Sequence, residues 1–168
     1  MRNHAENFFS TFKLTGTDPN NQRHEFTLDT LLQEKKPILF WLHPIDNKED
    51  CPHAEHHCAF RDSLITFASQ VLIVSICSDP IELHEKIRNR YHIPAYILSD
   101  PNHDYFPVGN WSDDLLCGHP CEGWTPSLYF TDIYGIIRHV WGSASATHHT
   151  NDLVHEINSY LITLNKVI

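Results

Sequence analysis

The apolar runs "ILFWLH" (38–43) and "VLIVSICS" (71–78) decide the fold class. Both are rich in branched and aromatic residues and lack polar alternation, which is typical of β-strands buried on both faces. From Pro52 onward the intervening segment is expected to form a helix. The apolar face of that helix is predicted to carry Phe60, Leu64 and Phe67. A strand, a helix and a strand in this order indicate a β-α-β unit.

The rest of the chain extends this pattern. In residues 79–93 Asp79 is predicted to cap a second helix with Pro80 at its first position, and a short strand "AYILSD" (95–100) follows. Two further strands, 125–132 and 135–142, are joined by the turn "DIYG" in an antiparallel hairpin. A last helix is expected over 151–164, with its apolar stripe formed by Leu153, Ile157 and Leu161. These elements predict an α/β fold of thioredoxin-like layout, a mixed sheet with helices on both faces.

Size and charge restrict the function. We expect residues 1–168 to form a single domain. A net charge of -9 without any basic run argues against nucleic-acid binding. The apolar runs are too short to span a bilayer and no secretory signal is evident, so we expect no membrane association and a cytoplasmic location. Five cysteines fit reactive or buried thiols better than a structural disulfide framework.

Several ordered sequence pieces resemble one family over most of the chain. They are "FTLDTLL", then "HP" after the first apolar strand, "CAFRD", "VSICSDP", "YILSDPNHDYF", "LYFTDIYGII" and "HH" ahead of the last helix. From about residue 25 to the C-terminus the chain resembles a peroxiredoxin of the bacterioferritin-comigratory or Q type, within the AhpC/TSA family of thioredoxin-fold thiol peroxidases. The resemblance implies a hydroperoxide substrate, a thioredoxin-like reductant and no cofactor. We expect a monomer or a homodimer.

The resemblance also implies a pair of redox cysteines. The family motif has a proline seven positions before the attacking cysteine, and Pro44 and Cys51 keep that separation. Cys51 directly precedes Pro52 at an expected helix start, where unpaired N–H groups favour a thiolate. Cys58, just before "AFRD", stands where the family has its resolving cysteine. His43, beside Pro44, is either a base near Cys51 or a polar strand end.

The chain departs from the family pattern at three places. Lys48 replaces a threonine, and Pro126 replaces an arginine that helps to hold thiolate and peroxide. The two cysteines are seven positions apart where the family usually has five, so that the expected place of the attacking cysteine falls on His53. Thr125–Pro126 resembles the cis-proline dipeptide of thioredoxins, and we expect a cis bond there. Trp124 precedes this dipeptide and is expected to cover Cys51.

Other interpretations stay open at this stage. "CPHA" (51–54) resembles the active-site motif of disulfide oxidoreductases, which favours a thioredoxin-type exchange protein, and a non-catalytic thioredoxin-fold module is the third alternative. The cluster of Cys51, His53, His56, His57 and Cys58 contains metal-ligand types, but its spacing matches no strong pattern and we assign no metal site. Cys117 and Cys121 are either loop thiols, a local disulfide or alternative resolving cysteines. Cys77 is predicted to be a small buried hydrophobic residue.

Overall fold

The fold is taken from a computed structural model of the chain. It describes residues 8–42, 66–92, 94–105, 115–116, 119–120, 127–141 and 150–165. No helix in those ranges is long and apolar enough to cross a membrane.

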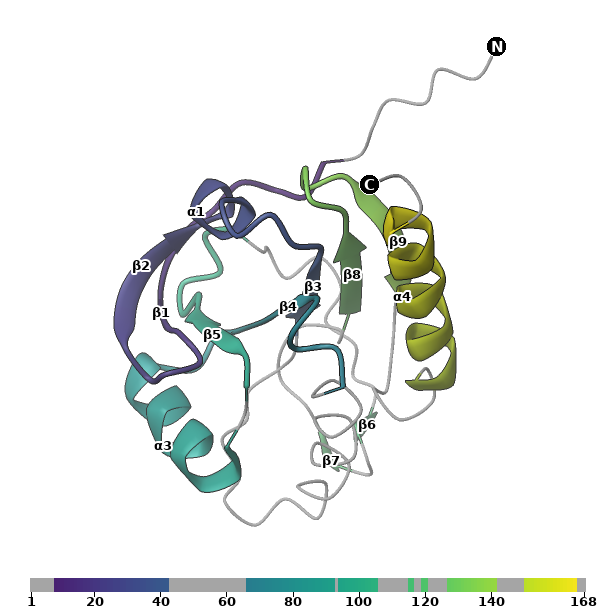
Figure 1. The fold of residues 1–168 in the computed structure, drawn as a ribbon. Coiled ribbons are helices and arrows are strands. Elements are labelled where there is room, and N and C mark those ends of the chain that lie inside the picture. The colour runs from purple at the N-terminus through teal and green to yellow at the C-terminus, as the bar shows by residue number, and fades with distance from the viewer. Residues whose placement is uncertain are drawn as a thin grey trace.

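A seven-stranded mixed sheet forms the centre of the described residues, in the strand order β2-β1-β5-β4-β3-β8-β9 (Figure 1). Its strands are β1 (Lys13–Thr17), β2 (Arg23–Thr27), β3 (Ile38–Leu42), β4 (Leu72–Cys77), β5 (Tyr96–Ser99), β8 (Ser127–Thr131) and β9 (Ile137–Trp141). A separate pair consists of β6 (Leu115–Leu116) and β7 (His119–Pro120). The described helices are α1 (Leu28–Leu32), α3 (Ile81–Tyr91) and α4 (Thr150–Asn165).

The centre of the sheet confirms the predicted fold class. β3, β4 and β5 are parallel, with Leu42 opposite Ile76 and Ile76 opposite Leu98. β8 and β9 form the predicted antiparallel hairpin, and β8 pairs antiparallel with β3. The carboxyl ends of three parallel strands therefore lie along one edge of the sheet.

Each face of the sheet carries its own apolar core. Ile38 and Phe40 of β3 pack on the face that α1 covers, together with Phe9 and Phe12 from the N-terminal segment. Leu39 packs on the opposite face, which α4 covers with Leu153, Ile157 and Leu161. This alternation is expected of strands covered on both sides. The predicted apolar stripe of the last helix is confirmed. Trp141 is buried, and Trp41 is half-buried against the second core.

The strands β1 and β2 were not predicted from the sequence. Their sequences, "KLTGT" and "RHEFT", are short and largely polar, and most of β2 is exposed at the sheet edge. β1 forms a strand because it pairs with β5, where Thr15 lies opposite Ser99 and Thr17 lies opposite Ile97. A side chain at Gly16 would place its Cβ 2.6 Å from the carbonyl oxygen of Ile97, so the close approach of the strands requires glycine there.

The predicted start of α3 is wrong by one residue. Pro80, in an extended conformation, is the N-cap, and no side-chain hydrogen bond caps the helix. Asp79 is instead buried in the turn before the helix, where its carbonyl oxygen accepts a hydrogen bond from the Ser99 hydroxyl. The aspartate therefore belongs to the contact with β5 rather than to a cap.

The turn between β8 and β9 has the predicted sequence and a specific polar support. The Asp132 carboxylate accepts hydrogen bonds from the backbone N–H groups of Tyr134 (2.8 Å) and Ile136 (3.0 Å). Gly135 has φ +81°, a conformation that side chains disfavour. The hairpin is thus set by one aspartate and one glycine.

Arg88 attaches α3 to the sheet. It is buried, and its guanidinium donates hydrogen bonds to the carbonyl oxygen of Thr17 (3.2 Å) and its hydroxyl (3.1 Å), and to the carbonyl oxygen of Ala95. Burial lowers the pKa of Arg88 to about 10, so the side chain remains cationic near neutral pH. One side chain thereby connects β1, α3 and the segment before β5.

We expect Arg88→Ala to lower the free energy of unfolding by about 2–4 kcal/mol, because it leaves buried carbonyl groups without their donor. Urea unfolding followed by circular dichroism measures this. Lys86→Ala on the exposed face of the same helix is the control and should change stability by less than about 0.5 kcal/mol. Equal stability of the two variants would contradict the assigned role.

Candidate functional site

The residues that the sequence nominates for the redox site lie outside the described residues. They are His43, Pro44, Lys48, Cys51, Cys58, Cys117, Cys121, Trp124, Thr125 and Pro126. The Thr125–Pro126 bond and the His/Cys cluster of residues 51–58 lie outside them as well. The predicted roles of all these residues remain predictions.

The described sheet does define where the segments carrying these residues are attached. Leu42, the last residue of β3, is the Cα partner of Ser127, the first residue of β8. Residues 43–65 follow Leu42 in the chain, and residues 121–126 precede Ser127. Both segments are therefore attached to the sheet at the same edge. It is the edge at which β4 ends at Cys77 and β5 ends at Ser99. Ligand and active sites of open α/β sheets lie beyond the carboxyl ends of the parallel strands.

A buried polar cluster lies at this edge. Cys77, Asp79 and His84 are 0%, 3% and 1% exposed. The Cys77 Sγ atom is 2.7 Å from His84 Nε2, and one ligand atom from each of the three residues lies within 4.8 Å of the other two. Burial of Cys77 confirms the sequence prediction, but its treatment as a purely apolar residue is wrong, because its sulfur contacts an imidazole. Alternation places Cys77 on the same face of β4 as Ile73, so α3 lies on that face.

Hydrogen bonds to two backbone carbonyl groups position this cluster. The Asp100 N–H donates to the Cys77 carbonyl oxygen (2.8 Å), and the Ser99 hydroxyl donates to the Asp79 carbonyl oxygen. The Asp100 carboxylate in turn accepts from the N–H groups of Asp104 (3.0 Å) and Tyr105 (3.3 Å). The end of β4 and the end of β5 are therefore held as one unit.

The chemistry open to Cys77 follows from its burial and its partner. When Nε2 of His84 carries a proton the ring donates to sulfur, and when it does not the thiol donates to the ring. Reactive cysteines are partly exposed, since a reagent must reach the sulfur. A fully buried Cys77 does not meet that condition, so it is not the thiol that attacks substrate in this conformation.

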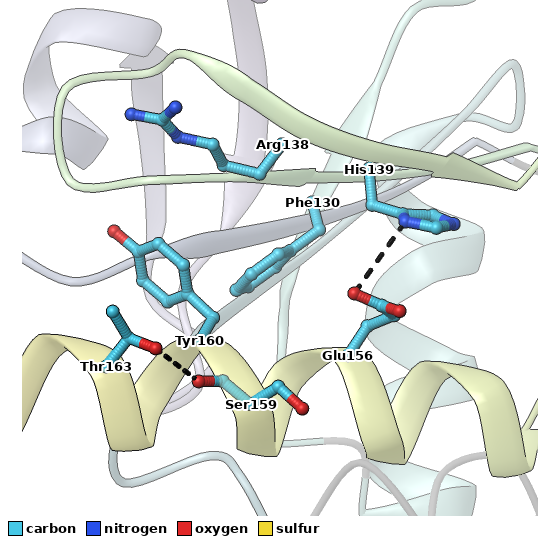
Figure 2. Close-up of a pocket in the computed structure, with 7 residues that line it drawn as sticks. All are labelled: Phe130, Arg138, His139, Glu156, Ser159, Tyr160 and Thr163. Atoms are coloured by element: carbon cyan, nitrogen blue, oxygen red, sulfur yellow. Dashed lines mark hydrogen bonds and ion pairs between the residues drawn. The ribbon is translucent and has the colours of Figure 1, made fainter.

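A second feature is a shallow hollow of about 240 Å³ between the β8–β9 hairpin and α4 (Figure 2). Its lining includes Arg138, which is bound to Asp132 (Nε–Oδ2 2.9 Å), and His139, whose Nδ1 is 3.9 Å from Glu156 Oε2. Burial, and less strongly the Asp132 carboxylate, raise the pKa of Tyr160, so its phenol stays protonated near neutral pH. Cysteine is not among the described residues that line the hollow, and we assign it no redox role.

Comparison with known sequences gives a family. A sequence model described as the AhpC/TSA family matches residues 5–140. A Coxiella burnetii protein named as a peroxiredoxin bcp is 25% identical over 141 residues, covering 82% of this chain and 90% of that protein. The chloroplastic peroxiredoxin Q of Suaeda salsa is 26% identical over 109 residues, covering 64% of this chain and 48% of that protein.

Solved structures show the same fold. Thioredoxin peroxidase I of Plasmodium yoelii superposes with a TM-score of 0.72 at 16% identity, covering 95% of this chain and 92% of that structure. The bacterioferritin comigratory protein of Xanthomonas campestris superposes with a TM-score of 0.66 at 14% identity, covering 88% and 91%. The thioredoxin-like architecture predicted from the sequence is confirmed.

The burial of Cys77 predicts slow chemical modification. We expect its peptide to stay unlabelled when the reduced native protein is treated with a maleimide, and to be labelled fully once urea is added. Peptide mass mapping with two isotopic maleimides, one before and one after denaturation, measures this. If Cys77 were labelled as fast in the native protein as in urea, the cluster would be open to solvent.

Proposed function

We propose a residue-level mechanism for this chain, which belongs to the AhpC/TSA family and is a thiol-dependent peroxidase. Cys51 is the attacking thiol and Cys58 the resolving thiol. The observation that carries this proposal is the pairing of Leu42 with Ser127. It supports a site at the carboxyl edge of the sheet, because the segment with Cys51 leaves β3 at that edge.

The position of Cys51 in the sequence supports the same assignment. Cys51 follows Pro44 by seven positions, the family spacing, and is nine positions from Leu42. It precedes Pro52 at the expected start of a helix, where the positive end of the helix dipole favours a thiolate. Among the described residues Cys77 is fully buried, which leaves the attack to a thiol elsewhere.

The proposed cycle has three steps. The Cys51 thiolate attacks one peroxide oxygen, the O–O bond breaks, and the leaving oxygen takes a proton to become water or an alcohol, while sulfur becomes a sulfenic acid. The Cys58 thiol then attacks the Cys51 sulfur, forming a disulfide and releasing water. A dithiol reductant resembling thioredoxin reduces the disulfide and returns both thiols.

The spacing of the two cysteines makes local unwinding part of this cycle. On one continuous helix, seven residues separate Cys51 and Cys58 by about 10 Å along the axis. A disulfide requires Cα atoms within about 7 Å. We propose that the first helical turns open when the bond forms, and that Cys117 and Cys121 are the alternative resolving thiols.

Supporting roles are proposed for the remaining residues nominated by the sequence. His43 acts as a base or hydrogen-bond partner beside Pro44, and the Lys48 ammonium favours the thiolate electrostatically. Trp124 covers the thiol and limits substrate size. Pro126 occupies the place of the family arginine, and it directly precedes Ser127, the partner of Leu42.

The cellular setting is also proposed. We place the chain in the cytoplasm, in line with its bacterial bcp relative, although the Suaeda salsa relative is chloroplastic. It acts as a single domain over residues 1–168, because one sheet draws strands from residues 13 to 141 and α4 packs on that sheet. It is a monomer or homodimer and binds neither nucleic acid nor membranes.

We expect Cys51→Ser to abolish peroxide consumption in an assay coupled to a thioredoxin reductant, because the nucleophile is lost. Cys58→Ser should allow one turnover and leave a sulfenic acid on Cys51, detected by dimedone trapping and mass spectrometry. Cys77→Ser is the control and should keep most of the activity. Full activity of Cys51→Ser, or a peroxide-induced Cys117–Cys121 disulfide with Cys51 still reduced, would show that Cys51 is not the attacking thiol.

We expect Pro126→Arg to raise peroxide turnover by about tenfold or more, because a positioned cation stabilises the developing oxygen charge. The second-order rate constant of Cys51 oxidation measures the gain. Lys86→Arg, on the exposed face of α3, is the control for a nonspecific change. An unchanged rate constant would show that arginine at this position is not what limits the reaction.

A further inference from the structure

We propose that Cys77, Asp79 and His84 form a binding site for a divalent transition-metal ion, with Zn²⁺ as the best match. A thiolate, a carboxylate and an imidazole are the three ligand types that zinc takes in proteins, whereas Ca²⁺ and Mg²⁺ take oxygen ligands. This proposal does not depend on the roles of Cys51 and Cys58.

The three ligands come from one short stretch of chain. Cys77 ends β4, Asp79 lies in the turn that follows, and His84 lies on α3. Their ligand atoms lie within 4.8 Å of one another. Bonds of about 2.3 Å to sulfur and about 2.0–2.1 Å to nitrogen at tetrahedral angles place those two atoms about 3.6 Å apart. Cys77 Sγ and His84 Nε2, now 2.7 Å apart, would separate by about 0.9 Å to admit the ion.

Charge balance suits the burial of this site. All three residues are at most 3% exposed. An isolated buried charge is costly, so buried ions must be paired or coordinated. A thiolate and a carboxylate together neutralise a divalent cation, and a neutral imidazole adds no charge. Binding converts the Cys77 thiol to a thiolate and releases its proton to solvent.

The surrounding structure holds the ligands near their places before binding. Asp100 and Ser99 hold the Cys77 and Asp79 carbonyl groups, and Arg88 fixes α3 one turn beyond His84. Groups that hold a ligand residue in place strengthen metal binding. The fourth coordination position is left for water, as at other three-ligand zinc sites.

The test uses the full chain with Cys51, Cys58, Cys117 and Cys121 changed to serine, so that only Cys77 can supply a thiolate. Co²⁺ is the probe, because thiolate coordination gives it a charge-transfer absorption band. We expect the band to saturate at one Co²⁺ per chain and to be displaced by Zn²⁺. Adding Cys77→Ser should remove it, and Asp79→Asn or His84→Gln should weaken binding by at least about tenfold, by analogy with losses at supporting residues.

Two further measurements keep the outcomes distinct. Circular dichroism identifies any variant that fails to fold, and the near-isosteric Asp79→Asn then decides the matter if Cys77→Ser does not fold. Zn²⁺ should also raise the melting temperature of the four-serine chain. The proposal would be overturned if no band appeared at excess Co²⁺. It would also be overturned if Asp79→Asn and His84→Gln bound Co²⁺ as tightly as the four-serine chain does. A wild-type protein without peroxidase activity would contradict the proposed role of Cys51, and it would not bear on the metal site.

Discussion

The in-register parallel pairing of β3 with β4 is the constraint on which the rest of the structure depends. Ile38, Leu39 and Phe40 are fully buried, so β3 has no face that tolerates water and must have a layer on each side. β4 and β8 cover its two edges, and α1 and α4 belong to the layers on its two faces. Because the central strands end at the same edge, polar groups gather there rather than in the core.

The two long described helices dock on the sheet by different physics. α4 buries Leu153, Ile157 and Leu161 at a spacing of four, the usual apolar stripe. α3 buries His84 and Arg88 at the same spacing and attaches through hydrogen bonds to Cys77, Thr17 and Ala95. A helix docked by polar contacts specifies its position strongly, since each unsatisfied buried group costs free energy. That specificity keeps the end of β4 and the end of β5 in a defined relation.

Much of the architecture was predictable because it depends on local pattern. Apolar runs predicted the buried strands, the turn residues predicted the hairpin, and the apolar stripe predicted α4. β1 and β2 could not be found in this way, because their residues are ordinary for a surface loop and form strands only where β5 offers an unpaired edge. The redox cysteines were nominated by the family resemblance and, for Cys51, by the expected helix start at Pro52. The described residues bear on them only through the strand ends to which their segments are attached.

The sequence by itself determined the fold class, because apolar runs, turn residues and helical periodicity are local patterns. Its ordered motifs also resemble the family to which the chain belongs, and that resemblance nominates Cys51 and Cys58. Only the tertiary structure decided which distant groups meet. Leu42 and Ser127 are partners because β8 completes the far side of β3, and no local pattern specifies that register. The sequence alone predicts a core residue of a strand at Cys77 and a polar residue of a helix at His84. They form a pair because the crossover from β4 folds α3 back over the end of that strand, a contact that depends on packing across the chain rather than on the residues beside either one.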